Sequence, residues 1–210
     1  MDLPLLVQED LDRAKAAVEA EPKHTLRPYY RQQIYRALAR WPKGKEARIR
    51  LDILTAQKVL PLWPESLSER LQPGRLIQRA MDVLEGRARP EVVSREADVA
   101  WAELEEFGAQ TSDEQESRAF LTALAALEST SYATGLDRMA TIEIGAHEED
   151  VHLDPWSSDA AKWASFAYAG RPREGMFNAA QQLEFWSWWL SEAIPAAWQA
   201  SSSNPNNSPS

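Results

Sequence analysis

The densest group of side chains that could do chemistry is an acidic segment holding two of the three histidines. It reads His147-Glu148-Glu149-Asp150-Val151-His152-Leu153-Asp154. Imidazole and carboxylate are the metal ligands left to a chain without cysteine. Helical histidine pairs that hold zinc are four residues apart, whereas His147 and His152 are five apart. We therefore expect an exposed acidic loop and no metal, with a metal-dependent helical hydrolase as the competing hypothesis.

The residues after this segment predict the start of a helix. Asp154 precedes Pro155, and a carboxylate ahead of a proline in the first turn is a good N-cap. Ser157 and Ser158 could cap the same helix equally well. Trp156 beside them would either cover the core or contact a partner, and residues of its kind more often cover the core.

A second candidate is the basic run between Lys23 and Arg50, in which Glu46 is the only acid. Tyrosines and Trp41 are interleaved with its cations, a mixture that can stack on bases and grip phosphates. If Ile34 faces the core, however, Arg36 and Arg40 project to the solvated side of their helix. A nucleic-acid-binding helical regulator using residues 23–50 is therefore the alternative function. The run contains Lys23, Arg27, Arg31, Arg36, Arg40, Lys43, Lys45, Arg48 and Arg50.

No familiar catalytic motif is found in the chain. The sequence has no Gly-x-Ser-x-Gly, P-loop or Gly-x-Gly-x-x-Gly pattern, and three histidines without a thiol leave few pairs of nucleophile and base. We therefore expect no enzyme activity, no catalytic residue and no cofactor.

Length and charge narrow the class of protein further. The 210 residues suit one helical domain over 1–200, followed by a disordered tail of Ser, Asn and Pro over 201–210. The formal charge of −9 argues against free nucleic acid as the main partner. Residues 1–90 hold 17 Lys and Arg against 12 Asp and Glu, a charge of +5, which leaves −14 for the remainder. The halves either attract each other within one domain or form a dipolar surface that steers a charged partner.

No apolar run near 18 residues is present, and the start Met1-Asp2-Leu3-Pro4 does not read as a secretory signal. We expect a cytoplasmic protein with no membrane contact.

Proline and glycine divide the sequence into segments of helical length. Tyr30, Ile34, Leu38 and Trp41 recur at helical spacing in one segment, and the other interiors agree. Only Thr141-Ile142-Glu143-Ile144 alternates like a strand. The prediction is an all-α, single-domain bundle of about eight helices with one short extended segment at most. The helices are expected over 5–20, 29–41, 46–60, 76–85, 91–107, 114–134, 158–169 and 177–194.

The last of these segments is unusually rich in tryptophan. Leu183, Trp186 and Leu190 form one stripe, and further aromatic residues widen it beyond one helix face. Such a helix is central to the core, or it docks on a partner; the first interpretation is favoured. Pro195 is expected to end or kink it, because the ring clashes with the carbonyl of Ser191.

The C-terminal third resembles a known family. The resemblance is carried by Trp163-Ala164-Ser165, by Ala167-Tyr168-Ala169-Gly170 and by Phe185-Trp186-Ser187-Trp188-Trp189-Leu190. These elements are similar to those of the mostly α-helical immunity protein family five of bacterial polymorphic-toxin systems. The chain departs from the family pattern after Gly170, where Arg171 and Pro172 stand in place of a second glycine.

The resemblance implies that the chain binds and blocks a cognate toxin domain in the cytosol of the producing cell. An acidic surface suits a basic toxin, since complementary charge speeds association. Such an interface also uses a few aromatic or arginine anchors. The residues expected to contribute to it are Glu148, Glu149, Asp150, Asp154 and Trp156.

Overall fold

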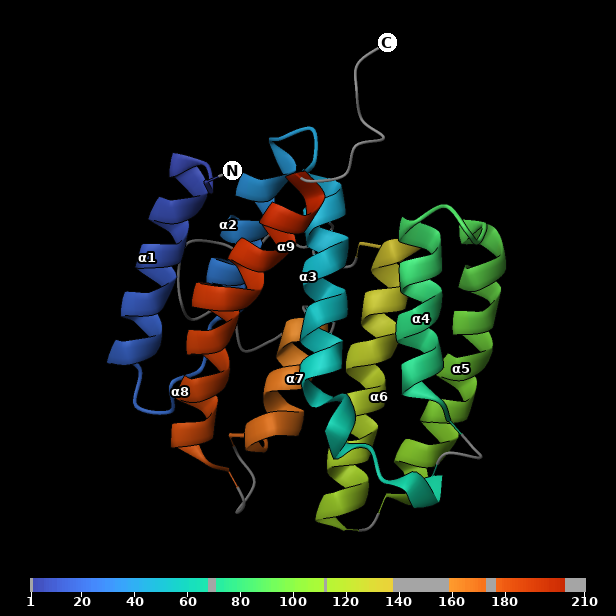
Figure 1. Cartoon of the computed structure of the whole chain (residues 1–210). Coiled ribbons are helices and arrows are strands. Elements are labelled where there is room, and N and C mark those ends of the chain that lie inside the picture. The colour runs from blue at the N-terminus through green and yellow to red at the C-terminus, as the bar shows by residue number, and fades with distance from the viewer. Residues whose placement is uncertain (1, 68–70, 112, 138–158, 173–176, 203–210) are drawn as a thin grey trace.

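The fold is given by a computed structural model, which describes residues 2–67, 71–111, 113–137, 159–172 and 177–202. Within these ranges every regular element is helical, and no strand is present (Figure 1). The all-α prediction is therefore confirmed, while the extended segment expected at 141–144 lies outside the described residues. The helices are α1 (Leu5–Ala20), α2 (Pro28–Ala39), α3 (Gly44–Val59), α4 (Pro73–Leu84), α5 (Pro90–Gln110), α6 (Glu114–Ala133), α7 (Ala160–Ala169), α8 (Ala179–Trp188) and α9 (Ile194–Ser202).

Two helices organise the bundle. α6 packs against α3, α4, α5 and α7, and α3 also packs against α2 and α9. Every residue of α6 from 121 to 131 is buried, and small side chains such as Ala123 and Ala126 let the neighbouring helices come close. A helix that is buried all round belongs at the centre of a core. In Figure 1, α1 and α5 lie at opposite edges of this arrangement.

Most helix ends fall within three residues of their predicted positions, and α1 matches its prediction at both ends. α5 was expected to end at residue 107, directly before Gly108, but it continues to Gln110. A Cβ atom on Gly108 would lie only 2.5 Å from the ring of Phe120. The glycine therefore permits close approach of α5 and α6 and does not terminate the helix.

The last helix also continues beyond its predicted end. A π turn at Trp189–Ala193 joins α8 to α9, which extends to Ser202, so of the two outcomes predicted for Pro195, an end or a kink, the end does not occur. In this turn the amide of Ile194 donates to the carbonyl of Trp189, five residues back. Because Pro195 has no amide hydrogen to donate, the wider π turn allows the helix to continue through it.

The π turn also moves the end of the last helix into the segment that was expected to be disordered. Ser201 is buried and donates to the carbonyl of Ala197, so the first residues of that segment belong to α9. Residues 203–210 lie outside the described residues.

Two helices begin with a carboxylate that accepts a backbone hydrogen bond. Asp113 accepts from the amide of Glu116 at the start of α6. At the start of α7 the cap is Asp159, which accepts from the amide of Lys162, so the prediction that Asp154, Ser157 or Ser158 caps this helix is wrong. α7 begins two residues later than expected, and Asp159 has the extended backbone that an N-cap needs.

Candidate functional site

The residues expected to bind a partner all lie outside the described part of the chain. Glu148, Glu149, Asp150, Asp154 and Trp156 fall within 138–158, as do His147 and His152. The described chain stops at Asp137, beyond the end of α6, and resumes at Asp159, directly before α7. The described residues therefore leave this surface untested, but they show how its C-terminal boundary is fixed.

Asp159 is fixed by a buried ion pair with α2. Nε of Arg31 donates to Oδ2 of Asp159 over 2.9 Å, and each side chain is only 2% exposed. The hydroxyl of Tyr35 donates to the same oxygen over 3.1 Å, while Oδ1 accepts from the amide of Lys162 over 2.7 Å. Arg31 also donates to the carbonyl of Leu26 over 2.6 Å. These bonds join the start of α7 to α2 across a sequence separation of 128 residues.

A second buried ion pair lies next to the first. Nε of Arg48 on α3 donates to Oδ2 of Asp52 over 2.9 Å, one helical turn away. The guanidinium carbon of Arg48 lies 3.0 Å from the ring centre of Tyr35 and 4.6 Å from that of Tyr132. Tyr35 thus contacts both pairs, and α2, α3, α6 and α7 meet at one polar cluster. We call it the buried ionic cluster: Arg31, Tyr35, Arg48, Asp52, Tyr132 and Asp159.

The two carboxylates of this cluster have opposite pKa shifts. Burial acts to raise the pKa of Asp159, but Arg31 and Arg48 hold that pKa below its usual value. Burial raises the pKa of Asp52 to about 7, although Arg48 opposes the shift. Asp159 accepts three hydrogen bonds, whereas Oδ1 of Asp52 is buried and accepts none from the described residues. Hydrogen bonds to the ionised form stabilise it, and desolvation without them favours the neutral form.

A carboxyl group with a pKa near 7 is suited to acid–base catalysis. Asp52, however, is 1% exposed and enclosed by Arg48 and the neighbouring helices. Burial likewise raises the pKa of Tyr132 to about 12, which leaves its hydroxyl protonated at neutral pH. The charged members of the cluster are buried and Tyr132 is half-buried, so the cluster serves to hold the helices together. Among the described residues, no group of three or more histidines and carboxylates is placed to hold a metal ion.

The tryptophan-rich block belongs to the core. Phe185, Trp186, Trp189 and Leu190 are buried, which confirms the favoured interpretation of this segment. Nε1 of Trp189 donates to Oγ1 of Thr55 on α3 over 3.0 Å. The rings of the block meet edge to face, an arrangement that adds to the energy of apolar burial.

The basic run does not form a continuous surface. Arg31 and Arg48 are buried in the ionic cluster, and Arg50 pairs with Glu46 over 2.9 Å. Arg36 and Arg40 are exposed, as predicted. The burial of Arg31 and Arg48 was not predicted. Arg31 lies three residues before Ile34, a spacing that would have placed it on the core side.

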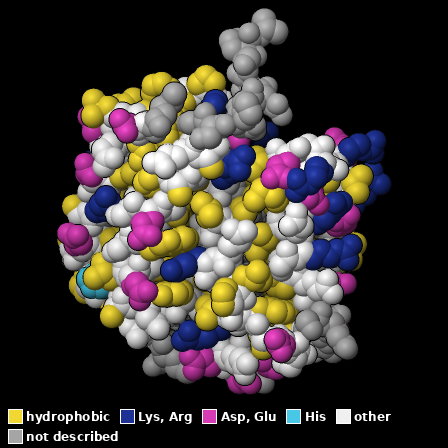
Figure 2. All heavy atoms as spheres, in the orientation of Figure 1, with side chains coloured by type: hydrophobic (Ala, Val, Ile, Leu, Met, Phe, Trp, Pro, Cys, Tyr) yellow, Lys and Arg dark blue, Asp and Glu magenta, His cyan; other side chains and the backbone are white. Residues whose placement is uncertain are grey.

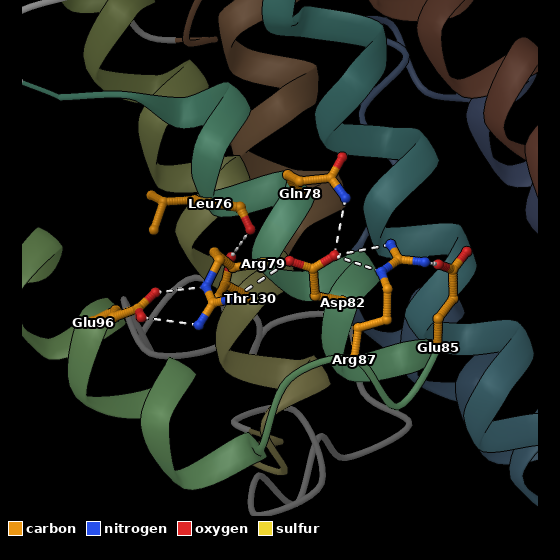
Figure 3. Close-up of polar contacts among 8 residues, drawn as sticks. All are labelled: Leu76, Gln78, Arg79, Asp82, Glu85, Arg87, Glu96 and Thr130. Carbon is orange, nitrogen blue, oxygen red and sulfur yellow. Dashed lines mark hydrogen bonds and ion pairs between the residues drawn. The ribbon is translucent and has the colours of Figure 1, made fainter.

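Part of the acidic charge is also used within the fold. Arg79 on α4 donates twice to Glu96 on α5, over 2.7 and 2.9 Å (Figure 3). Asp82 accepts from Gln78 and from Arg87, which also pairs with Glu85. The hydrogen bonds from Arg79 lower the pKa of Glu96, and those from Gln78 and Arg87 lower the pKa of Asp82. These carboxylates stabilise the α4–α5 hairpin.

In the part of the chain that the structure describes, none of the helices could cross a membrane. Together the elements define a helical bundle whose charged cluster is buried. The family model described as Immunity protein Imm5 matches residues 11–196, and the chain therefore belongs to the Imm5 family of immunity proteins. Its function thus lies in toxin immunity. A comparison with curated proteins finds no match.

Proposed function

We propose that the chain protects the cell that makes it by binding a cognate toxin domain in the cytoplasm and blocking it, without catalysis of its own. The observation that carries this proposal is the match to the Imm5 family over residues 11–196. The buried ionic cluster supports it, because the charged groups that could act on a substrate are closed off by side chains. Binding requires a surface only, which a rigid helical bundle supplies.

A titration separates a binding protein from an enzyme. Purified chain is added to the toxin domain encoded by the open reading frame beside its gene, and residual toxin activity is measured. A binding protein abolishes activity at one equivalent, whereas an enzyme that modifies the toxin does so at far lower ratios given time. If the neighbouring toxin stays active at every ratio, and co-expression does not rescue growth, the proposal is wrong.

The acidic residues Glu148, Glu149, Asp150 and Asp154 are proposed as part of the toxin-binding surface, with Trp156 as an anchor. Asp159, fixed by Arg31 and Tyr35, supports this assignment because it gives the segment a rigid C-terminal boundary. Reversing Glu148, Glu149 and Asp150 to lysine is expected to slow association at least tenfold at low salt. The matched control reverses three exposed acids of α5 and should leave the rate nearly unchanged. These acids are Glu103, Glu105 and Glu106.

Nucleic-acid binding through residues 23–50 is not favoured by the structure. Two of the arginines in this run are buried and a third is paired, so these three of its nine cations are withdrawn from a phosphate backbone. A shift assay at low salt with the Arg36→Glu, Arg40→Glu double variant as control tests this alternative.

A further inference from the structure

One end of the molecule exposes large apolar side chains. Leu5 and Leu6, in the first turn of α1, are 73% and 44% exposed, and Trp41, between α2 and α3, is 43% exposed. Figure 1 places the start of α1, the α2–α3 turn and the end of α9 at the same end of the bundle. Figure 2 shows hydrophobic side chains gathered there. We call this surface the Trp41 end: Leu5, Leu6, Trp41 and Pro42.

Trp198 of α9 connects the parts of this surface. Its ring packs edge to face on Trp41 with ring centres 6.4 Å apart. Its Nε1 donates to the carbonyl of Asp2 over 3.2 Å, directly before α1. The side chain of Trp198 is itself buried, so it forms the floor of the surface while Trp41 projects from it.

The turn that carries Trp41 is tightly built. The amide of Trp41 donates to the carbonyl of Leu38 over 3.1 Å, and the amide of Gly44 donates to the carbonyl of Trp41 over 2.9 Å. A Cβ atom on Gly44 would lie 1.9 Å from the carbonyl oxygen of Leu38, so only glycine permits this approach. Because the backbone is fixed and Trp198 holds one edge of the ring, binding through Trp41 costs little conformational entropy.

The cations of this surface lie on its Trp41 side, while Asp2 and Glu9 are exposed near Leu5. Arg36 and Arg40 lie one helical turn apart on the exposed side of α2, and Lys45 is exposed just beyond the turn. Apolar centres with charged rims are typical of binding surfaces, where tryptophan and arginine contribute most of the energy. Leucine side chains neither stack on bases nor bond to phosphates, so the surface fits a protein better than a nucleic acid. Two copies meeting symmetrically here would bring like charges together.

We propose that the Trp41 end is an anchor for the cognate toxin domain, with Trp41, Leu5 and Leu6 filling an apolar hollow that has carboxylates on the side that receives Trp41. This inference rests on the proposed function and adds the surface and its chemistry. The charge beside Trp41 is positive, whereas the segment from Glu148 to Asp154 is acidic and requires cations on the toxin. A toxin domain that meets both surfaces carries a basic region and a separate acidic one.

Two variants test the anchor against a control of the same kind. Leu5→Asp puts a carboxylate on the surface at the first residue of α1, where a negative charge favours the helix. Trp41→Ala removes the central ring. Val99→Asp is the matched control, because Val99 is 61% exposed on α5 at the opposite edge of the bundle. Binding is measured by calorimetry to a catalytically inactive form of the toxin domain encoded beside the gene.

We expect Leu5→Asp and Trp41→Ala each to weaken binding at least about 30-fold, which is about 2 kcal/mol at 1.4 kcal/mol per tenfold. Val99→Asp should stay within about threefold of the wild type. Thermal unfolding of each variant checks that the fold is retained, and Leu5→Asp decides the result if Trp41→Ala unfolds. Arg40→Glu should also weaken binding, most strongly at low salt.

The possible negative results show which of the two proposals, the anchor or the proposed function, is wrong. If the wild type binds and protects but the two variants do so equally well, the anchor is wrong and the proposed function stands. If Arg40→Glu strengthens binding, the rim faces cations and the stated partner chemistry is wrong. If the wild type neither binds the toxin domain nor protects against it, both proposals fall. A shift of labelled duplex DNA that Arg40→Glu abolishes assigns this end to nucleic acid and overturns the anchor.

Discussion

Replacing Arg31 by methionine tests whether the buried ionic cluster holds the bundle together. Methionine keeps an unbranched apolar chain beneath Trp186, whose ring centre lies 5.8 Å from the guanidinium carbon of Arg31. The substitution removes the charge that faces Asp159 and the hydrogen bond to the carbonyl of Leu26. It leaves a carboxylate that is 2% exposed with only neutral donors.

The loss of stability expected for Arg31→Met follows from the burial of Asp159. Removing one partner of a buried ion pair destabilises a protein by about 3–5 kcal/mol, because the other charge stays buried without its counterion. A domain is stable by about 5–15 kcal/mol, so Arg31→Met should remove a large part of the free energy of unfolding. The pair Arg50–Glu46 provides the matched control, since its side chains are 19% and 18% exposed. Arg50→Met should cost about 1 kcal/mol or less.

The assay is urea unfolding followed by tryptophan fluorescence at pH 7. A third protein, Arg31→Met with Asp159→Asn, keeps an N-cap side chain on α7 but has no buried charge at this position. It should be more stable than Arg31→Met alone, which measures the coupling between the two residues. If Arg31→Met costs no more than Arg50→Met, the ion pair does not carry the stability assigned to it. If the double variant is less stable than Arg31→Met, the penalty does not come from the unpaired carboxylate.

The same unfolding assay checks three further predictions. Gly44→Ala should cost about 1–3 kcal/mol, because its Cβ would overlap the carbonyl of Leu38 and force the α2–α3 turn apart. Trp189→Phe should cost about 2 kcal/mol, since it loses the hydrogen bond to Thr55 and part of a buried ring. Asp52→Asn tests the pH dependence of stability. The pKa of Asp52 is about 7 in the folded protein and near 4 in the unfolded chain, so the wild type loses stability as the pH rises from about 4 to about 7. The variant lacks this loss, so its advantage should grow from pH 5 to pH 8, and a constant difference would contradict the shift.

The sequence was sufficient to predict the class of fold and most helix ends. Prolines at the first helical turn are found in α2, α4 and α5. Side-chain spacing also identified Ile34 and Leu38 as residues of the core face of α2. Such signals are local, because caps and ring constraints act within a few residues.

Tertiary contacts could not be predicted in the same way. Trp41 continues the spacing of Ile34 and Leu38, which predicted a place in the core, but α2 ends at Ala39 and the turn leaves Trp41 half exposed. The spacing of Arg31 from Ile34 indicates the core side of α2, but its partner lies 128 residues away, so no local pattern identifies the ion pair. The sequence shows that Arg48 and Asp52 are four residues apart, a spacing that allows an ion pair on a helix. Only the packing of the helices shows that this pair is buried.

The uneven charge of the two halves has a concrete structural expression. Arg31 and Arg79, from the basic first 90 residues, each pair with a carboxylate of the acidic remainder. These contacts agree with the interpretation that the halves attract each other within one fold. They also remove those arginines from any surface role, because a paired cation cannot meet a partner without first breaking its bond. Three cations of the basic run, Arg36, Arg40 and Lys45, remain exposed in the part of the chain that contains Trp41. Charge is thus neutralised where the halves meet, and the proposed anchor predicts that a partner supplies carboxylates on the side that receives Trp41.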